Sequence, residues 1–127
     1  MTVIMVVDDE RPLREFLTQT LETSGYRVVQ AVNGRHALHL IANAGPDGPD
    51  LIISDVMMPL IGGVELCQTL KGNPITAGIR VVLMSAGVGR GSLYANADGF
   101  IAKPFDLDTF DALITSVLAA APPDPAN

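Results

Sequence analysis

Five short apolar runs alternate with stretches of helical periodicity along this chain. The runs are rich in β-branched residues and are continuous, which is typical of strands buried on both faces of a sheet. We expect strands at residues 3–7, 27–31, 51–54, 80–84 and 100–102. Such strand–helix repetition favours an α/β fold with helices on both faces of a parallel sheet. The sequence therefore predicts a doubly wound, five-stranded parallel sheet.

The spacing of apolar residues also predicts the helices and their inward faces. The first helix spans about residues 12–24, and its recurring apolar side chains are Leu13, Phe16, Leu17 and Leu21. The second begins at Asn33-Gly34 and ends in a loop at residues 44–49. The last is capped by Asp106, and its inward side chains are Leu107, Phe110, Ile114 and Val117. With a helix after the third strand, these elements complete the α/β pattern.

Size and charge limit the kind of molecule that the chain can be. It has 127 residues, 48% of them hydrophobic and 17% charged, which suits one folded domain with a sizeable core. We assign residues 1–121 to that domain and residues 122–127 to a Pro-rich tail. The formal net charge of −6 repels phosphate backbones, and no basic stripe is apparent. We therefore expect no direct binding to nucleic acid.

The single cysteine and the N-terminus indicate the compartment. Cys67 alone permits no disulfide within the chain and no cysteine-based zinc site, and its inward place on a predicted helix indicates an inert core thiol. The first seven residues form too short an apolar run for a signal peptide or a membrane span. We therefore expect a cytoplasmic protein without a membrane segment.

Polar side chains follow four of the five predicted strands. Asp8 and Asp9 come after the first strand, Asp55 after the third, Ser85 after the fourth and Lys103 after the fifth. Ligands of open α/β sheets bind beyond these carboxyl ends. Three close carboxylates are stable together only around a cation, and an all-oxygen set suits Mg²⁺ or Mn²⁺. A lysine and a hydroxyl add donors for anionic oxygens, so the sequence predicts a phosphoryl-binding pocket with an aspartate acceptor.

Each of these residues also has a purely structural interpretation. An aspartate after a strand commonly caps a helix or forms a turn, and a single serine or lysine there is usually solvated. Their combination at one edge of the sheet favours a site. His36 and His39 lie three residues apart on one predicted helix without an apparent third ligand, so we expect exposed histidines rather than a metal pair.

The motifs at the strand ends resemble those of the receiver domain of two-component response regulators, whose fold is the flavodoxin-like (βα)5 sheet. The resemblance covers about residues 2–120, and a further matching segment follows the second strand at residues 31–34. The four motifs that carry it occur in the family's order at residues 6–10 (VVDDE), 53–59 (ISDVMMP), 84–86 (MSA) and 100–105 (FIAKPF).

The resemblance implies roles for the acidic residues. Asp55 would receive the phosphoryl group from a phosphohistidine. Asp9 and Asp55 would ligate Mg²⁺, together with the backbone carbonyl of Met57, and Asp8 would reach the metal mainly through water. On this interpretation Mg²⁺, or Mn²⁺ in its place, is the cofactor that the chain requires.

The resemblance also implies roles for residues on the last two strands. Ser85 and Lys103 would contact the phosphoryl oxygens, and Ser85 would move toward them on activation. Phe100 occupies the position of the family's switch aromatic, although burial in the core would explain it equally well. The Lys103-Pro104 bond falls where the family usually has a cis peptide.

The segment between Ser85 and Lys103 departs from the family. It is about four residues shorter than usual, and it carries Gly87, Gly89 and Gly91. Each glycine costs about 1 kcal/mol relative to alanine in a helix. We therefore expect a fourth helix that is short, displaced or absent, and residues 86–97 that become ordered on phosphorylation.

The resemblance implies a stand-alone signalling module rather than an enzyme acting on an outside substrate. Its own chemistry would be Mg²⁺-dependent self-phosphorylation from a phosphodonor and slow autodephosphorylation. The partners implied are a histidine kinase or phosphotransfer protein and a downstream protein that the sequence does not name. The alternative is a receiver-like binding module that does not switch by phosphorylation. An aspartate-based phosphatase is disfavoured because it would need a second aspartate where Met57 stands.

Overall fold

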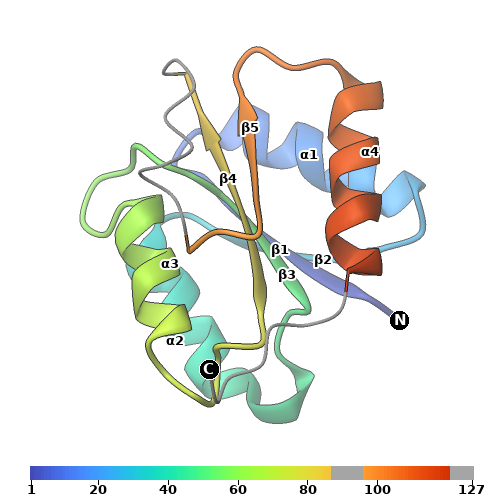
Figure 1. Cartoon of the computed structure of the whole chain (residues 1–127). Coiled ribbons are helices and arrows are strands. Elements are labelled where there is room, and N and C mark those ends of the chain that lie inside the picture. Colours follow the sequence, from blue (N-terminus) through green and yellow to red (C-terminus); the bar gives the residue numbers. More distant parts are fainter. Residues whose placement is uncertain (87–95, 121–127) are drawn as a thin grey trace.

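A computed structural model describes residues 1–86 and 96–120 as a parallel sheet covered by helices (Figure 1). The strand order is β2-β1-β3-β4-β5, and every neighbouring pair is parallel. The predicted five-stranded, doubly wound fold is therefore confirmed, and each strand agrees with its expected range to within one residue. The strands are β1 (Val3–Val7), β2 (Arg27–Ala31), β3 (Leu51–Asp55), β4 (Arg80–Ser85) and β5 (Gly99–Ala102).

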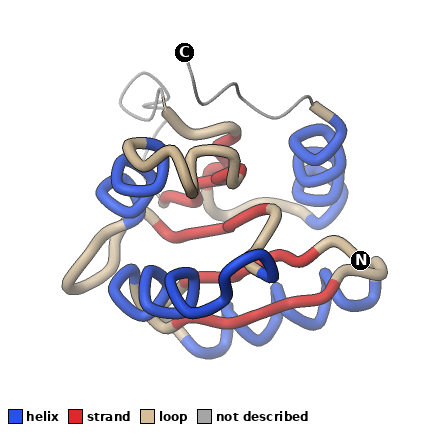
Figure 2. Tube along the Cα trace, turned by 90° about the horizontal axis from the view of Figure 1, so that it is seen from below, coloured by secondary structure: helices blue, strands red, loops and turns tan. Residues whose placement is uncertain are grey.

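Among the described residues, two helices cover each face of this sheet, and Figure 2 shows the resulting layers. One face carries α1 (Arg11–Thr23) and α4 (Leu107–Ala119), and the other carries α2 (Gly34–Ala44) and α3 (Gly63–Lys71). The expectation of an irregular helix before β5 falls mainly on residues 87–95, which lie outside the described residues. The Pro-rich tail at residues 122–127 lies outside them too.

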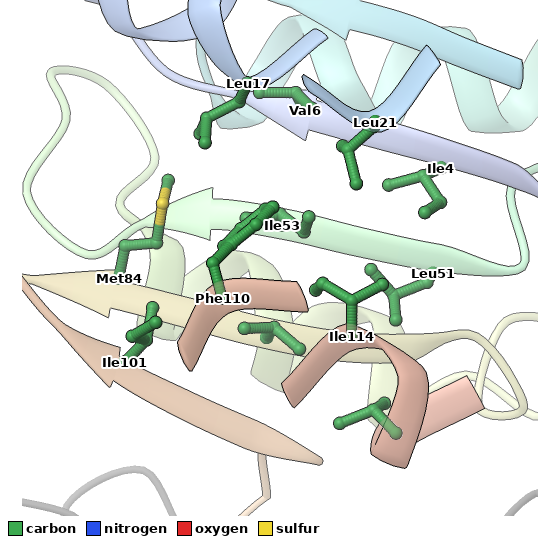
Figure 3. Close-up of a cluster of buried hydrophobic side chains, with 12 residues drawn as sticks. Ile4, Val6, Leu17, Leu21, Leu51, Ile53, Met84, Ile101, Phe110 and Ile114 are labelled. Carbon is green, nitrogen blue, oxygen red and sulfur yellow. The ribbon is translucent and has the colours of Figure 1, made fainter. Parts of the chain in front are cut away.

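The hydrophobic core is divided by the sheet into two clusters of buried side chains. In the cluster under α1 and α4, Leu17 and Leu21 lie on the same face of the central strands as Phe110 and Ile114 (Figure 3). The Phe110 ring also stacks on Phe105, with 5.4 Å between the ring centroids. Full burial of one such side chain stabilises a fold by about 1.5–3 kcal/mol. These contacts hold α1 and α4 on the sheet and so fix the loops at its carboxyl edge.

Two of the predicted inward side chains are instead exposed. Phe16 is 49% exposed because it precedes Leu17 by one residue and therefore points about 100° away from the buried stripe of α1. Leu107 is 42% exposed, since it lies in the first turn of α4, at the edge of the stripe that begins at Phe110. The predictions of these two residues as core were wrong.

Capping side chains confirm two predicted helix starts. The Asn33 side chain accepts a hydrogen bond from the His36 amide at 2.8 Å, and Asp106 accepts one from the Thr109 amide at 2.7 Å. The loop expected at residues 44–49 is not entirely irregular, because Gly45–Asp47 form a short 3₁₀ helix. Pro46 suits that turn, since proline has no amide hydrogen to leave unpaired there.

No helix within residues 1–86 and 96–120 has the length and apolar character that crossing a membrane requires.

A cavity of about 790 Å³ opens at the amino ends of β3 and β4, between the ends of α2 and α3. Asp50 and Arg80 line this cavity, which contains none of the polar residues that follow the strands. The chemistry predicted from the sequence therefore lies at the opposite edge of the sheet.

Candidate functional site

The parallel register brings the predicted site residues to one edge of the sheet. Asp55 is the last residue of β3 and pairs with Met84 of β4, next to Ser85. Asp8 directly follows β1, and its amide donates to the Ala31 carbonyl at the end of β2. Because the three strand ends are adjacent, side chains 47 residues apart in the sequence become neighbours.

Three carboxylates converge at this edge. Asp8, Asp9 and Asp55 each offer an oxygen, and these oxygens lie within 4.8 Å of one another. It is the one group of three or more metal-ligating side chains found in residues 1–86 and 96–120. Asp8 and Asp55 are buried, whereas Asp9 is exposed, so the cluster opens to solvent on one side. His36 and His39 do not join any such group within the described chain.

The environment of Asp8 tests whether this cluster suits a cation. Its side chain is 0% exposed, and within the described chain its Oδ2 atom is buried without a hydrogen-bond partner. Burial raises the pKa of the Asp8 carboxyl above its usual value, while the Glu10 amide lowers the pKa and the nearby Asp55 charge raises it. An acidic pocket with an unsatisfied oxygen fits a hard divalent ion such as Mg²⁺.

Lys103 aims its ammonium group at the same cluster. Its Nζ atom lies 3.1 Å from Asp55 Oδ2 and 3.8 Å from Asp8 Oδ2. The lysine amide donates to the Ser85 carbonyl at 2.7 Å, which places this side chain at the ends of β4 and β5. The Lys103-Pro104 peptide is cis, as expected from the resemblance. The structure therefore joins Lys103 to the carboxylates as the sequence predicts.

The backbone around Asp55 is held from both sides. The Val56 amide donates to the Met84 carbonyl at 2.8 Å, and the Gly63 amide donates to the Val56 carbonyl at 3.0 Å. A Cβ atom on Gly63 would overlap the carbonyl oxygen of Asp55, so α3 can begin this close to β3 only with glycine at its first position. This close approach holds the start of α3 against the end of β3, beside Asp55.

The remaining predicted residues lie around this centre. Ser85 is 6% exposed at the end of β4, beside the strand that carries Lys103. Met57 follows Asp55 by two residues, and its amide lies 3.4 Å from Asp55 Oδ1 while its side chain is 78% exposed. Phe100 is half-buried against the cluster under α2 and α3. The geometry thus gathers these residues, and their chemical roles remain predictions.

Sequence reasoning missed Arg14 on α1. Its guanidinium donates through one terminal nitrogen to the Asp8 carbonyl and through Nε to Gln30 Oε1, each at 2.9 Å. The signal available was a basic residue one turn into the helix that follows the acidic pair.

Cys67 is 2% exposed, and burial raises the pKa of its thiol, which agrees with the prediction of an inert core residue.

The family model for the response regulator receiver domain matches residues 4–115. Response regulator MprA from Mycolicibacterium vanbaalenii is 39% identical over 123 residues, which cover 95% of this chain and 52% of that protein. MprA from Mycobacterium tuberculosis is 38% identical over 125 residues, with 97% and 53% covered. The chain thus spans about half the length of the curated relatives it matches.

Solved structures show the same architecture. The signal receiver domain of a histidine kinase from Syntrophus aciditrophicus superposes with a TM-score of 0.84 at 34% identity, covering 94% of this chain and 91% of that one. The response regulator TrrA from Thermotoga maritima, in complex with Mg(2+)-BeF, gives a TM-score of 0.81 at 30% identity, covering 92% and 99%. Sequence and structure therefore agree on one family.

Proposed function

Because this chain belongs to the response regulator receiver domain family, we propose that Asp55 accepts a phosphoryl group from a histidine kinase or a phosphotransfer protein. The observation that carries the proposal is the convergence of Lys103 Nζ, 3.1 Å from Asp55 Oδ2, with the three-carboxylate cluster. A carboxylate flanked by a cation and a metal site is suited to form an acyl phosphate.

The chain's own groups supply position and charge for the transfer. An Asp55 oxygen would form a bond to phosphorus while the bond from phosphorus to the donor nitrogen breaks. The electron pair of that bond would stay on the donor nitrogen, and the histidine, protonated on its other ring nitrogen, would leave as a neutral imidazole. Lys103, whose Nζ lies 3.1 Å from Asp55 Oδ2, would hold one oxygen of the arriving group, and the Ser85 hydroxyl would hold another. Phosphoryl transfer needs little else from a protein beyond positioning and electrostatic stabilisation.

Asp9 and Asp55 would hold Mg²⁺, with the Met57 carbonyl as a third ligand and Asp8 acting through water. Bound Mg²⁺, or Mn²⁺, neutralises the carboxylates and draws negative charge from the phosphoryl oxygens. Within the described chain the buried Oδ2 atom of Asp8 has no hydrogen-bond partner, and burial together with the Asp55 charge raises the pKa of this carboxyl, so a divalent cation there would favour its ionised form. The similarity of this chain to TrrA, whose structure is a complex with Mg(2+)-BeF, also supports the proposal.

We further propose that the receiver signals by contact with another protein or domain and works in the cytoplasm. Phosphorylation would bias a small population shift in which Ser85 and Phe100 take part. The curated relatives run to about twice this length, so a stand-alone form is a proposal as well. The chain would turn over no outside substrate, and its own reactions would be self-phosphorylation and slow autodephosphorylation.

Intact-mass spectrometry tests the acceptor function. The protein is incubated with acetyl phosphate, with Mg²⁺ or with a chelator, and compared with Asp55→Asn and with Asp47→Asn, a control at an exposed aspartate. We expect a gain of one phosphoryl group in the parent and in Asp47→Asn, only with Mg²⁺, and none in Asp55→Asn. Absence of labelling in the parent would favour the receiver-like binding module, and labelling of Asp55→Asn would place the acceptor elsewhere.

A further inference from the structure

We propose that Arg14 is a positioning residue for the cation site, because it fixes the short loop that carries Asp8 and Asp9. This loop, Asp8–Glu10, joins β1 to α1. Its first residue has a buried side chain, and its second supplies the exposed carboxylate of the cluster. The inference rests on the proposed function for its consequence, Mg²⁺ binding, but its geometric part stands on the contacts of Arg14.

Arg14 is bonded to both ends of the loop. Its guanidinium donates to the Asp8 carbonyl at 2.9 Å, and its backbone amide donates to the Glu10 carbonyl at 3.1 Å. The loop closes on itself as well, since the Glu10 amide donates to Asp8 Oδ1 at 2.8 Å. Asp9 therefore lies between Asp8, whose carbonyl the Arg14 side chain binds, and Glu10, whose carbonyl accepts the backbone bond that remains in any Arg14 variant considered below.

A second bond directs the guanidinium toward the loop. Arg14 Nε donates to Gln30 Oε1 on β2 at 2.9 Å, so the arginine spans α1, the end of β1 and the neighbouring strand. The planar guanidinium can make both bonds at once from a fixed fork, whereas the ammonium of lysine is a point donor. A lysine at this position would keep the charge and at most one of these two contacts.

These contacts indicate that Arg14 contributes to the cation site by holding the loop at residues 8–10 in place, and not through its positive charge. Among the ion pairs of residues 1–86 and 96–120, none joins Arg14 to a carboxylate of the cluster, whereas Lys103 contacts two of them. By Coulomb's law, a positive charge near a divalent-cation site weakens cation binding. Loss of the arginine would therefore tighten Mg²⁺ binding if charge dominated, and would weaken it if position dominates.

The test is isothermal titration of Mg²⁺ into the parent protein, Arg14→Ala, Arg14→Lys and Arg11→Ala. Arg11 is the matched control, because it lies on the same helix, carries the same charge and, within the described chain, its side chain bonds only to exposed Glu15. Loss of a group that holds a metal ligand typically weakens metal binding by 10–100-fold, so we expect about a tenfold rise in Kd for Arg14→Ala. Arg14→Lys should be intermediate, and Arg11→Ala should match the parent.

Amide hydrogen exchange at Asp9 and Glu10 in metal-free buffer provides a measurement that does not depend on the metal. We expect these two amides to exchange faster in Arg14→Ala than in the parent, at an intermediate rate in Arg14→Lys, and at the parent's rate in Arg11→Ala. The amides of the β-sheet should be equally protected in all four proteins, which shows that the fold is intact. Unchanged exchange in Arg14→Ala, or Mg²⁺ binding as tight as the parent's, would overturn the proposal. If the parent itself binds no Mg²⁺, the proposed cofactor fails, and the exchange result alone decides the role of Arg14.

Discussion

Asp8 is the residue whose surroundings bear most directly on the proposed cation site. Its carboxylate lies out of contact with solvent, with Lys103 Nζ at 3.8 Å and, within the described chain, no hydrogen bond to its Oδ2 atom. A buried acceptor in this state costs about 1–3 kcal/mol. A buried carboxylate oxygen without a hydrogen bond therefore lies at the position where the proposed function needs a water-mediated contact to Mg²⁺.

In metal-free buffer, Asp8→Asn is expected to raise the free energy of unfolding near neutral pH, because it removes a buried carboxylate whose pKa is raised. Because the folded-state pKa is raised, ionisation of Asp8 destabilises the fold fully above that pKa. The advantage of the variant should therefore shrink as the pH falls toward the ordinary value of 3.8. Urea denaturation at several pH values measures this, and a variant less stable than the parent at neutral pH would contradict it.

Gly63 is the second residue whose identity the geometry dictates. Gly63→Ala forces Cβ into the Asp55 carbonyl, so we expect about 1–3 kcal/mol of destabilisation and slower phosphorylation by acetyl phosphate. Gly78→Ala is the control, since a Cβ there meets nothing within 4 Å. Equal denaturation midpoints for the two variants would show that α3 can shift without cost.

At the level of elements, one ion pair joins three parts of the fold away from the candidate site. Lys71 Nζ at the end of α3 lies 2.8 Å from Asp98 Oδ2, just before β5, and donates to the Ile79 carbonyl at 2.8 Å. The same Asp98 oxygen accepts from the Val81 amide at 2.8 Å. Both side chains are mostly buried, so the pair fixes the start of β5 against β4 and α3.

Removal of one partner of a mostly buried ion pair leaves the other charge uncompensated. We therefore expect Asp98→Ala to lower the free energy of unfolding by about 3 kcal/mol. Glu15→Ala breaks the exposed pair with Arg11 and should change stability little. Chemical denaturation compares the two variants, and a similar small loss for both would mean that the Lys71–Asp98 pair contributes no more than a surface contact.

The sequence predicted the strands well because they are buried on both faces and therefore form continuous apolar runs. It predicted helix faces less well, since periodicity places a residue on a stripe but does not say where the sheet ends. The prediction of Leu107 was wrong for this reason, whereas that of Phe16 was wrong because Phe16 lies about 100° from the buried stripe of α1. The 3₁₀ turn at Gly45–Asp47 was missed because its glycine and proline are equally typical of irregular loops.

At the scale of the whole molecule, the site follows from topology. Parallel strands place all their carboxyl ends on one edge, so the order of the motifs was enough to predict that Asp8, Asp55 and Lys103 meet. The contacts of Arg14 were not predictable from this rule, because they depend on the angle at which α1 returns along the sheet. The fold thus determines which residues meet, and individual side-chain geometry determines how they are held.

The central claim is that Asp55 carries the phosphoryl group, and borohydride reduction followed by peptide mapping tests it most directly. Hydride converts an aspartyl phosphate to homoserine and leaves free carboxylates unchanged. After incubation with acetyl phosphate and Mg²⁺, we predict homoserine at position 55 and unmodified Asp8 and Asp9, with no conversion when Mg²⁺ is chelated. Conversion at Asp8 or Asp9, or the absence of homoserine in a protein that binds Mg²⁺, would contradict the account.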